Sequence, residues 1–167
     1  MHISDRLLEL GTFYNREARR CVKSKSYLAA AIMQVSALEA ALQAMCFMYP
    51  AEVKRTTVFQ RKRFKGKRYR ALEFSLYELI NIADELVWFL AKKINWGKRT
   101  TLAGFTHEIR KLRNFVHPGV WAREHAPTKF SKETYGVIIE VFDVATSWLV
   151  HRVHQGLYKR MQKEGLV

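Results

Sequence analysis

Hydrophobic residues recur at intervals of three and four along most of this chain, which is the spacing of one face of an α-helix. No stretch alternates hydrophobic and polar residues for long enough to predict a strand. The first helix is predicted from about Ser4 to about Lys23, with Ser4 as its N-cap. The second begins near Ser26 and ends before Pro50, because proline has no backbone N–H to donate.

The third predicted helix has the best start signal in the sequence. Ser75 and Glu78 have the spacing of a capping box, in which each side chain accepts a hydrogen bond from the other residue's backbone N–H. Phe74 and Leu79 occupy the positions of a hydrophobic staple around this cap. Gly97 is the expected C-cap, because glycine adopts the left-handed conformation that ends many helices.

Two further helices complete the predicted fold. The fourth starts between Thr100 and Thr106 and stops at Pro118, and the fifth runs from near Ser131 towards Tyr158. Helices of this length joined mostly by short connections pack most simply as antiparallel neighbours. We therefore expect one all-α domain spanning residues 1–167, an up-and-down antiparallel bundle of four to five helices with a basic connection at about 51–70.

Charge points to a polyanionic partner. The 167 residues carry 29 Lys and Arg against 15 Asp and Glu, a formal net charge of +14. Such an excess favours nucleic acid first, through counterion release, and an anionic membrane surface second. Because 49% of the residues are hydrophobic, the chain has enough apolar surface to fold around a core, which excludes a disordered polycation.

A cytoplasmic location is expected from two features. Asp5 and Glu9 interrupt the start of the chain, so we predict no secretory leader, and Cys21 and Cys46 are expected to be reduced. The stretch 28–49 is long enough to span a bilayer, but it carries Glu39 near its middle, where a charge costs roughly 2.5–3.5 kcal/mol. It is interpreted as a buried helix, and no membrane association is predicted.

The basic connection is the most one-sided segment of the chain, because no acid occurs between Glu52 and Glu73. Its cations could neutralise several phosphates, and the interleaved Phe59, Phe64 and Tyr69 could stack on unpaired bases. The alternative is a solvated loop that contributes only solubility and positive steering. The candidate nucleic-acid-binding residues are Arg61, Lys62, Arg63, Lys65, Lys67 and Arg68.

A polar stripe on the fourth helix is the sharpest chemical signal. With His107 at zero and 100° per residue, its other members fall between about 240° and 340°, beside an apolar face at about 140–220°. Arginine matches phosphate oxygens bidentately, and histidine can move a proton near neutral pH, so the stripe suits phosphoryl chemistry. The alternative is a helix-terminal histidine beside solvated arginines. The stripe consists of His107, Arg110, Arg113, Asn114 and His117.

Two other sets of residues have the composition of candidate sites. Glu39, the only acid between Glu17 and Glu52, is expected to be paired because a lone buried charge is costly. It could hold Arg110 or Arg113 across the bundle, or form a purely structural pair. His151 and His154 are spaced to share a metal, but no Cys or acid cluster completes a ligand set, so neither a metal site nor a cofactor is predicted.

The segment Arg113-Asn114-Phe115-Val116-His117-Pro118-Gly119, preceded by a long helix carrying Ala37-Leu38-Glu39-Ala40, resembles the signature of the HEPN (higher eukaryotes and prokaryotes nucleotide-binding) proteins. The resemblance covers about 26–149. The usual motif has four to six residues between Arg and His and a polar residue after the Arg. Here Arg110 has the spacing and Arg113 has the following Asn114, so either could be the functional arginine.

The resemblance implies a helical bundle that forms a homodimer, with the two Arg/His stripes brought together. It also implies RNA binding and a metal-independent endoribonuclease, often part of a toxin–antitoxin or phage-defence system with an antitoxin partner. In that role His117 would exchange the proton, an arginine and Asn114 would contact the phosphate, and Glu39 and His107 would support them. The competing hypothesis is a non-catalytic helical module that binds nucleic acid or a protein.

Overall fold

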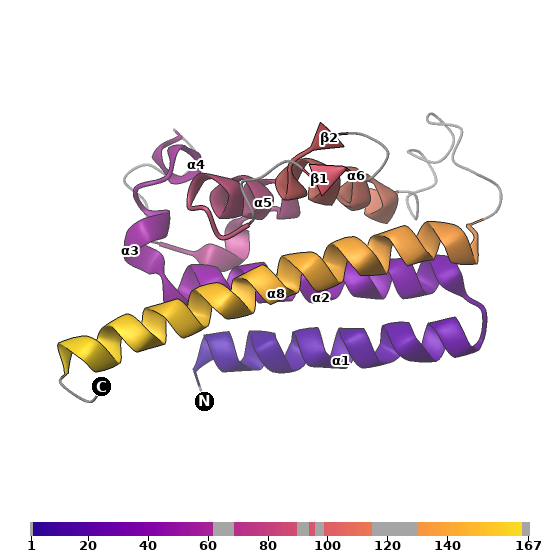
Figure 1. Ribbon diagram of the computed structural model, residues 1–167, viewed down its shortest axis with the longest axis horizontal. Helices are drawn as coiled ribbons and strands as arrows, with labels where there is room; N and C mark the ends of the chain where they lie inside the picture. Colours follow the sequence, from indigo (N-terminus) through magenta and orange to yellow (C-terminus); the bar gives the residue numbers. More distant parts are fainter. Residues whose placement is uncertain (1, 62–68, 90–93, 96–98, 115–129, 165–167) are drawn as a thin grey trace.

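The computed structural model describes residues 2–61, 69–89, 94–95, 99–114 and 130–164, and only the backbone for 94–95, 99–100, 112–114, 159–160 and 163. Helices α1 (Ile3–Lys23) and α2 (Tyr27–Met48) form an antiparallel hairpin whose members lie side by side over their whole length (Figure 1). Lys25, with φ of 58°, makes the turn between them. The bounds of both helices agree with those predicted from the sequence to within one or two residues.

The N-cap of α1 is His2, and the prediction of Ser4 for this position was wrong. The His2 backbone N–H donates to Asp5 Oδ2 at 3.1 Å, while the Ser4 side chain is buried and its hydroxyl lies 2.8 Å from His2 Nδ1. The helix starts earlier because Asp5 occupies the position from which a carboxylate can accept this N–H. Ile3 is therefore the first residue inside the helix.

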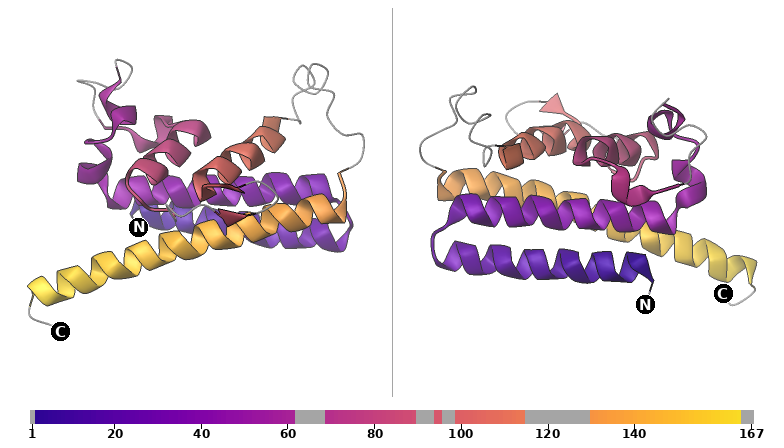
Figure 2. Two further views of the ribbon diagram at one scale, coloured as in Figure 1. Left: turned by 45° about the horizontal axis from the view of Figure 1, so that its top comes forward. Right: turned by 180° about the vertical axis from the view of Figure 1, so that it is seen from behind.

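Helix α2 is the centre of the fold and is buried on several sides. Helix α1 covers one side, α8 (Lys132–Lys163) lies along another, and α5 (Leu76–Glu85) and α6 (Leu102–Asn114) cover the side opposite α1 (Figures 1 and 2). A helix covered in this way is apolar around most of its circumference. Among the described residues α2 is the one helix long and apolar enough to cross a membrane, and 56% of that window is buried within the protein.

Helix α8 runs in the same direction as α2, which departs from a simple alternation of up and down helices (Figure 1). Ser131 supports its first turn, since the Ser131 hydroxyl accepts from the Thr134 backbone N–H at 3.2 Å. The helix confirms the predicted start and continues five residues beyond Tyr158. Its C-terminal end extends past α1 and α2 into open space.

Helix α5 starts at the predicted capping box but ends twelve residues before Gly97, so the predicted end was wrong. Ser75 Oγ accepts from the Glu78 backbone N–H at 3.3 Å, and the Ser75 backbone N–H donates to Glu78 Oε2 at 2.8 Å. At the other end Val87 has φ of 54°, a left-handed conformation that stops the helix. The chain reverses there because Trp88 and Phe89 turn back into the core. Gly97 lies outside the described residues.

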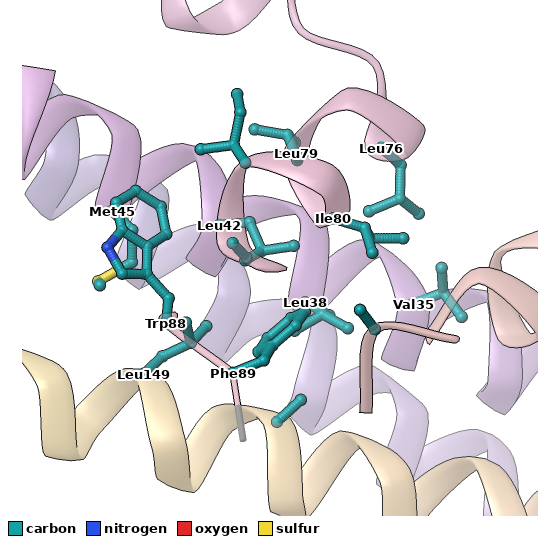
Figure 3. Packing of buried hydrophobic residues seen from close by; sticks show 14 of the residues in the cluster. Val35, Leu38, Leu42, Met45, Leu76, Leu79, Ile80, Trp88, Phe89 and Leu149 are labelled. Atoms are coloured by element: carbon teal, nitrogen blue, oxygen red, sulfur yellow. The ribbon is translucent and has the colours of Figure 1, made fainter. Parts of the chain in front are cut away.

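The core gathers around α2 (Figure 3). Trp88 lies beside Met45, and Phe89 lies beside Leu38, with Leu149 of α8 next to both aromatic side chains. Trp88 and Phe89 are 0% and 1% exposed, and burial of a large apolar side chain contributes about 1.5–3 kcal/mol. These residues join the α5 layer to the α2–α8 layer and so hold the two layers together.

In the described parts of the connection between α2 and α5, residues 49–61 and 69–75, the chain forms short helical turns. These are α3 (Pro50–Val53), α4 (Thr57–Gln60) and the 3₁₀ turn η1 (Ala71–Glu73). Before α6, strands β1 (Ile94–Asn95) and β2 (Arg99–Thr100) pair antiparallel. With so little strand, the prediction of an all-α fold is confirmed.

Candidate functional site

Helix α6 carries two described members of the predicted polar stripe, His107 and Arg110, and the described residues of its apolar side are buried or half-buried. Leu102, Ala103 and Ile109 are buried against the neighbouring helices. The buried Thr106 hydroxyl has a hydrogen-bond partner within the helix, because it donates to Leu102 O at 2.8 Å. His107 and Arg110 lie at the edge of this buried face and are half-buried. The helix begins within the range predicted for it, and His107 and Arg110 are the members of the stripe whose side chains the structure describes.

His107 and Arg110 both pack on the side chain of Tyr77, which belongs to α5. Its ring centroid lies 5.0 Å from that of His107, and Arg110 Cζ lies 5.4 Å from the centre of the same ring. A guanidinium at this distance is attracted to the electron-rich face of the ring, an interaction worth about 0.5–2 kcal/mol. Tyr77 remains 45% exposed, so the cluster is open to solvent from the α5 side.

Asn81, one turn after Tyr77, sets the hydrogen bonding of His107. Its Nδ2 donates to Tyr77 O at 2.9 Å, which turns Oδ1 towards His107 Nε2 at 3.4 Å. In the tautomer that makes this contact a hydrogen bond, Nε2–H donates to the amide oxygen and Nδ1 carries the lone pair. His107 Nδ1 is buried and has no hydrogen-bond partner among the residues that the structure describes.

Burial, more than any charge, lowers the pKa of His107 below its ordinary value of 6.5. The positive charge of Arg110 lowers this pKa further, and Lys111 adds a smaller effect in the same direction. The carboxylates of Asp84 and Glu108 oppose these effects. Both burial and the neighbouring arginine therefore favour the neutral form of the His107 imidazole.

Arg110 has an unsatisfied donor. Its Nε is buried and has no hydrogen-bond partner within the described part of the chain. A buried donor left unpaired costs about 1–3 kcal/mol, so a ligand that accepts from it would recover that free energy. An oxyanion suits this arginine chemically, because a guanidinium offers several N–H groups in one plane to phosphate oxygens.

The remaining members of the stripe are only partly covered by the structure. The backbones of Arg113 and Asn114 form the last turn of α6, and their side chains lie outside the described residues, as does all of His117. Glu39 is half-buried on α2, and its pairing with Arg110 or Arg113 stays a prediction. The described cluster is thus Tyr77, Asn81, His107 and Arg110, which we call the α5–α6 cluster.

In the basic connection, two of the aromatic residues expected to face a nucleic acid pack inward instead. Arg61 is exposed at the end of α4, whereas Lys62, Arg63, Phe64, Lys65, Lys67 and Arg68 lie outside the described residues. Phe59 is 9% exposed, and Tyr69 packs between Phe59 and Phe74 at ring distances of 5.8 and 6.2 Å. The expectation that these two rings stack on bases is wrong, because they are used to pack the connection onto the core.

Tyr69 is fixed there by its hydroxyl, which donates to Cys46 O at 2.6 Å. Lys54 Nζ lies 5.8 Å from the centre of the Tyr69 ring, so one cation of the connection is held on the packed aromatic group. Burial raises the pKa of Cys46 to about 12, which agrees with a core thiol rather than a nucleophile. Cys21 and Cys46 are both free thiols.

His151 and His154 are exposed on α8, and His151 Nε2 lies 2.8 Å from Gln155 Nε2. Within the described ranges no three His, Cys, Asp or Glu side chains gather as metal ligands.

Tyr77 and Asn81 were not recognised as site residues from the sequence. Their spacing of four residues places them on one helical face, which is the only signal the sequence offered. That face meets α6 because the short α5 packs directly on α6, a pairing that helical periodicity does not specify.

Similarity to known proteins adds no further information on this cluster. No family model matches the sequence, and no curated protein or solved structure is significantly similar to it. The resemblance to HEPN proteins therefore rests on the sequence alone, on the segment 113–119 and on the preceding helix that carries Ala37-Leu38-Glu39-Ala40.

Proposed function

We propose that the α5–α6 face binds RNA and that the Arg/His stripe of α6 cleaves it without a metal ion, as the resemblance to HEPN endoribonucleases implies. The α5–α6 cluster carries this proposal. Arg110 sits on Tyr77 with a buried N–H that has no acceptor among the described residues, and the His107 imidazole, whose neutral form is favoured, lies beside it. The net charge of +14 supports a polyanionic ligand.

The reaction would be attack of the ribose 2′-oxygen on the adjacent phosphorus. A new O2′–P bond forms, the P–O5′ bond breaks, a base removes the 2′ proton, and the 5′ oxygen gains one. His117 is the group proposed to exchange these protons, and Arg110 or Arg113 would stabilise the charge on the phosphate oxygens. Asn114 would orient the imidazole or contact the phosphate. His107 would position Arg110 through their shared contact with Tyr77.

The alternative is a non-catalytic module that binds nucleic acid or a protein partner. A specific observation favours it: the cation–π contact of Arg110 and the Asn81–His107 contact are also ordinary polar packing between two helices. Under this alternative the wild-type protein binds RNA and leaves it intact. On the resemblance alone we extend the proposal to a homodimer acting in the cytoplasm in a toxin–antitoxin or phage-defence system, with an antitoxin protein as partner.

Removal of one arginine at a time tests the proposal. Binding of a fluorescently labelled single-stranded RNA is measured by anisotropy, and cutting of the same RNA is followed on a gel. Arg110→Gln should weaken binding by at least about tenfold, since a hydrogen bond to a charged group is worth ~1.5–3 kcal/mol. Arg20→Gln removes the same charge from α1 on the opposite side of α2 and should have little effect. Equal effects of the two variants would contradict an RNA site at the α5–α6 face.

A further inference from the structure

An elongated groove lies on α2 between α1 and α8, on the side away from the α5–α6 cluster. Its volume is about 450 Å³, within the range of about 300–1,000 Å³ that clefts for small molecules have. Ala37, Ala41 and Met48 of α2 line its floor, with Leu8 on the α1 wall and Val150 on the α8 wall. The floor from Ala37 to Met48 is about 16 Å long, so the groove fits a straight chain better than a compact ring system.

The lining of this groove is apolar and carries no fixed charge. Of the described residues that line it, none is Asp, Glu, Lys or Arg. Its two threonines use their hydroxyl protons within their own helices. Thr12 donates to Leu8 O at 2.9 Å, and Thr146 donates to Phe142 O at the same distance. A charged group placed here would lose its water without gaining a partner, so the lining favours an uncharged apolar chain.

Hydrogen-bonding side chains meet the groove at its two ends. Asn15 of α1 lines one end and lies beside Gln34, whose Nε2 donates to Asn15 Oδ1 at 3.5 Å. Gln34 is 0% exposed, yet its Oε1 has no hydrogen-bond partner within the described part of the chain. The Asn15–Gln34 pair therefore lacks a donor. His154 lines the other end, near the point where Arg152 rests on the Tyr49 ring.

The charged residues around the Asn15 end do not favour an ionic ligand of either sign. Arg16 follows Asn15 on α1, and Asp143 follows the lining residue Phe142 on α8. Both are exposed and their charges are opposite. A neutral head that can both donate and accept a hydrogen bond suits this end best, because the Asn15 amide offers both kinds of group.

We propose that the groove binds an uncharged single-chain amphiphile, a straight alkyl chain that ends in a hydroxyl or a primary amide. The chain lies along Ala37 and Ala41 between the walls formed by α1 and α8. The head lies at Asn15, where its O–H or N–H supplies the donor that the Asn15–Gln34 pair lacks. This site is separate from the α5–α6 cluster, and it rests neither on the proposed RNA chemistry nor on a second copy of the chain.

Titration of the full chain with n-octanol, followed through the amide signals of its NMR spectrum, tests binding and location together. The signals of Ala37, Ala41 and Val150 should shift and saturate, while those of Tyr77 and the rest of the α5–α6 cluster should stay in place. Octanoate has the same number of carbon atoms but an ionised head at neutral pH, so it should bind at least about tenfold more weakly.

Variants test the lining. Ala41→Leu fills the floor and should weaken n-octanol binding at least about tenfold, because the groove then lacks room for the chain. Leu8→Ala should weaken it several-fold, whereas Leu10→Ala is the matched control on the same helix. Leu8 and Leu10 are 46% and 40% exposed, and only Leu8 lines the groove. Asn15→Ala removes the polar end and should also weaken n-octanol binding several-fold.

Because both leucines are at the surface, the Leu8→Ala and Leu10→Ala pair decides the result if Ala41→Leu fails to fold. Equal binding by these two variants would overturn the proposal. Shifts that do not saturate within the solubility of n-octanol, or that saturate outside the groove, would show that no alkyl chain is held there, as expected if the groove instead takes a helix of another protein. Octanoate that binds as tightly as n-octanol would contradict the neutral head.

Discussion

The Tyr77 ring lies 5.0 Å from the ring of His107, and this contact joins α5 to the polar stripe of α6. The same ring holds Arg110 on its face. One aromatic side chain therefore positions both members of the stripe whose side chains the structure describes. The chemistry proposed for α6 thus depends on a residue of a different helix.

Replacement of Tyr77 should show whether its aromatic ring or its hydroxyl group supports RNA binding. Tyr77→Leu removes the surface on which Arg110 rests and should weaken RNA binding several-fold, because the cation–π contact is worth about 0.5–2 kcal/mol. Tyr77→Phe keeps the ring and should bind within about twofold of the wild type. Fluorescence anisotropy with one RNA measures both variants. Equally weakened binding by the Phe and Leu variants would show that the hydroxyl, and not the ring, is what matters.

His107 should make the protein less stable in mild acid. Its pKa is lowered in the folded state, so the unfolded chain binds the proton more readily. The contribution of neutral His107 is fully present above the ordinary value of 6.5 and is lost as the pH falls towards the lowered pKa. Urea unfolding from about pH 7.5 to about pH 5 should show a smaller loss of stability for His107→Gln than for the wild type. Identical pH profiles would contradict the assigned protonation state.

The basic connection should supply affinity rather than chemistry. Replacing Arg61, Lys62 and Arg63 together by Gln should weaken RNA binding and reduce the dependence of log affinity on log salt by about 0.7 for each phosphate that is no longer neutralised. Replacing the exposed Arg16, Arg19 and Arg20 of α1 by Gln removes the same charge and serves as the control. Binding measured at several salt concentrations gives both slopes. An unchanged slope for the first variant would rule out phosphate binding by these three residues.

Gly156 fixes how closely α8 approaches the end of α2. A Cβ at this position would lie 2.6 Å from the Tyr49 hydroxyl oxygen, whereas a Cβ at Gly136 meets nothing within 4 Å. Gly136→Ala should stabilise the protein by about 0.5–1 kcal/mol through helix propensity, and Gly156→Ala should destabilise it. In a Tyr49→Phe background, which lacks the obstructing oxygen, Gly156→Ala should become neutral or stabilising. Thermal unfolding compares the four variants, and a Gly156→Ala penalty that persists without the hydroxyl would refute the steric explanation.

Periodicity was sufficient to predict α1, α2 and α8, because each keeps an apolar pattern over its whole length and ends near a strong local signal such as Pro50. The end of α5 was not predictable in this way. Val87 leaves the helix because Trp88 and Phe89 fill the core beside α2, which is a tertiary effect. Expecting Phe59 and Tyr69 to stack on bases failed for a related reason, since aromatic residues in a basic segment can equally pack inward.

In the candidate site, too, the contacts within one helix were predictable and the contacts between helices were not. His107 and Arg110 were predicted as neighbours because both lie on one helix, where the spacing alone sets their relative position. Their partners Tyr77 and Asn81 come from α5, and the packing of α5 on α6 depends on side-chain shape across the whole core. The sequence therefore predicts which residues share a helical face and leaves open what that face meets.

Cleavage of a labelled RNA in the presence of EDTA tests the central claim most directly. The wild type should cut the RNA, and the products should end in 2′,3′-cyclic phosphate, because the 2′-oxygen is the proposed nucleophile. His117→Ala should abolish the cuts while RNA binding and helical circular dichroism stay close to those of the wild type. Wild-type protein that leaves the RNA intact, or a His117→Ala variant that cuts as fast as the wild type, would contradict the catalytic account.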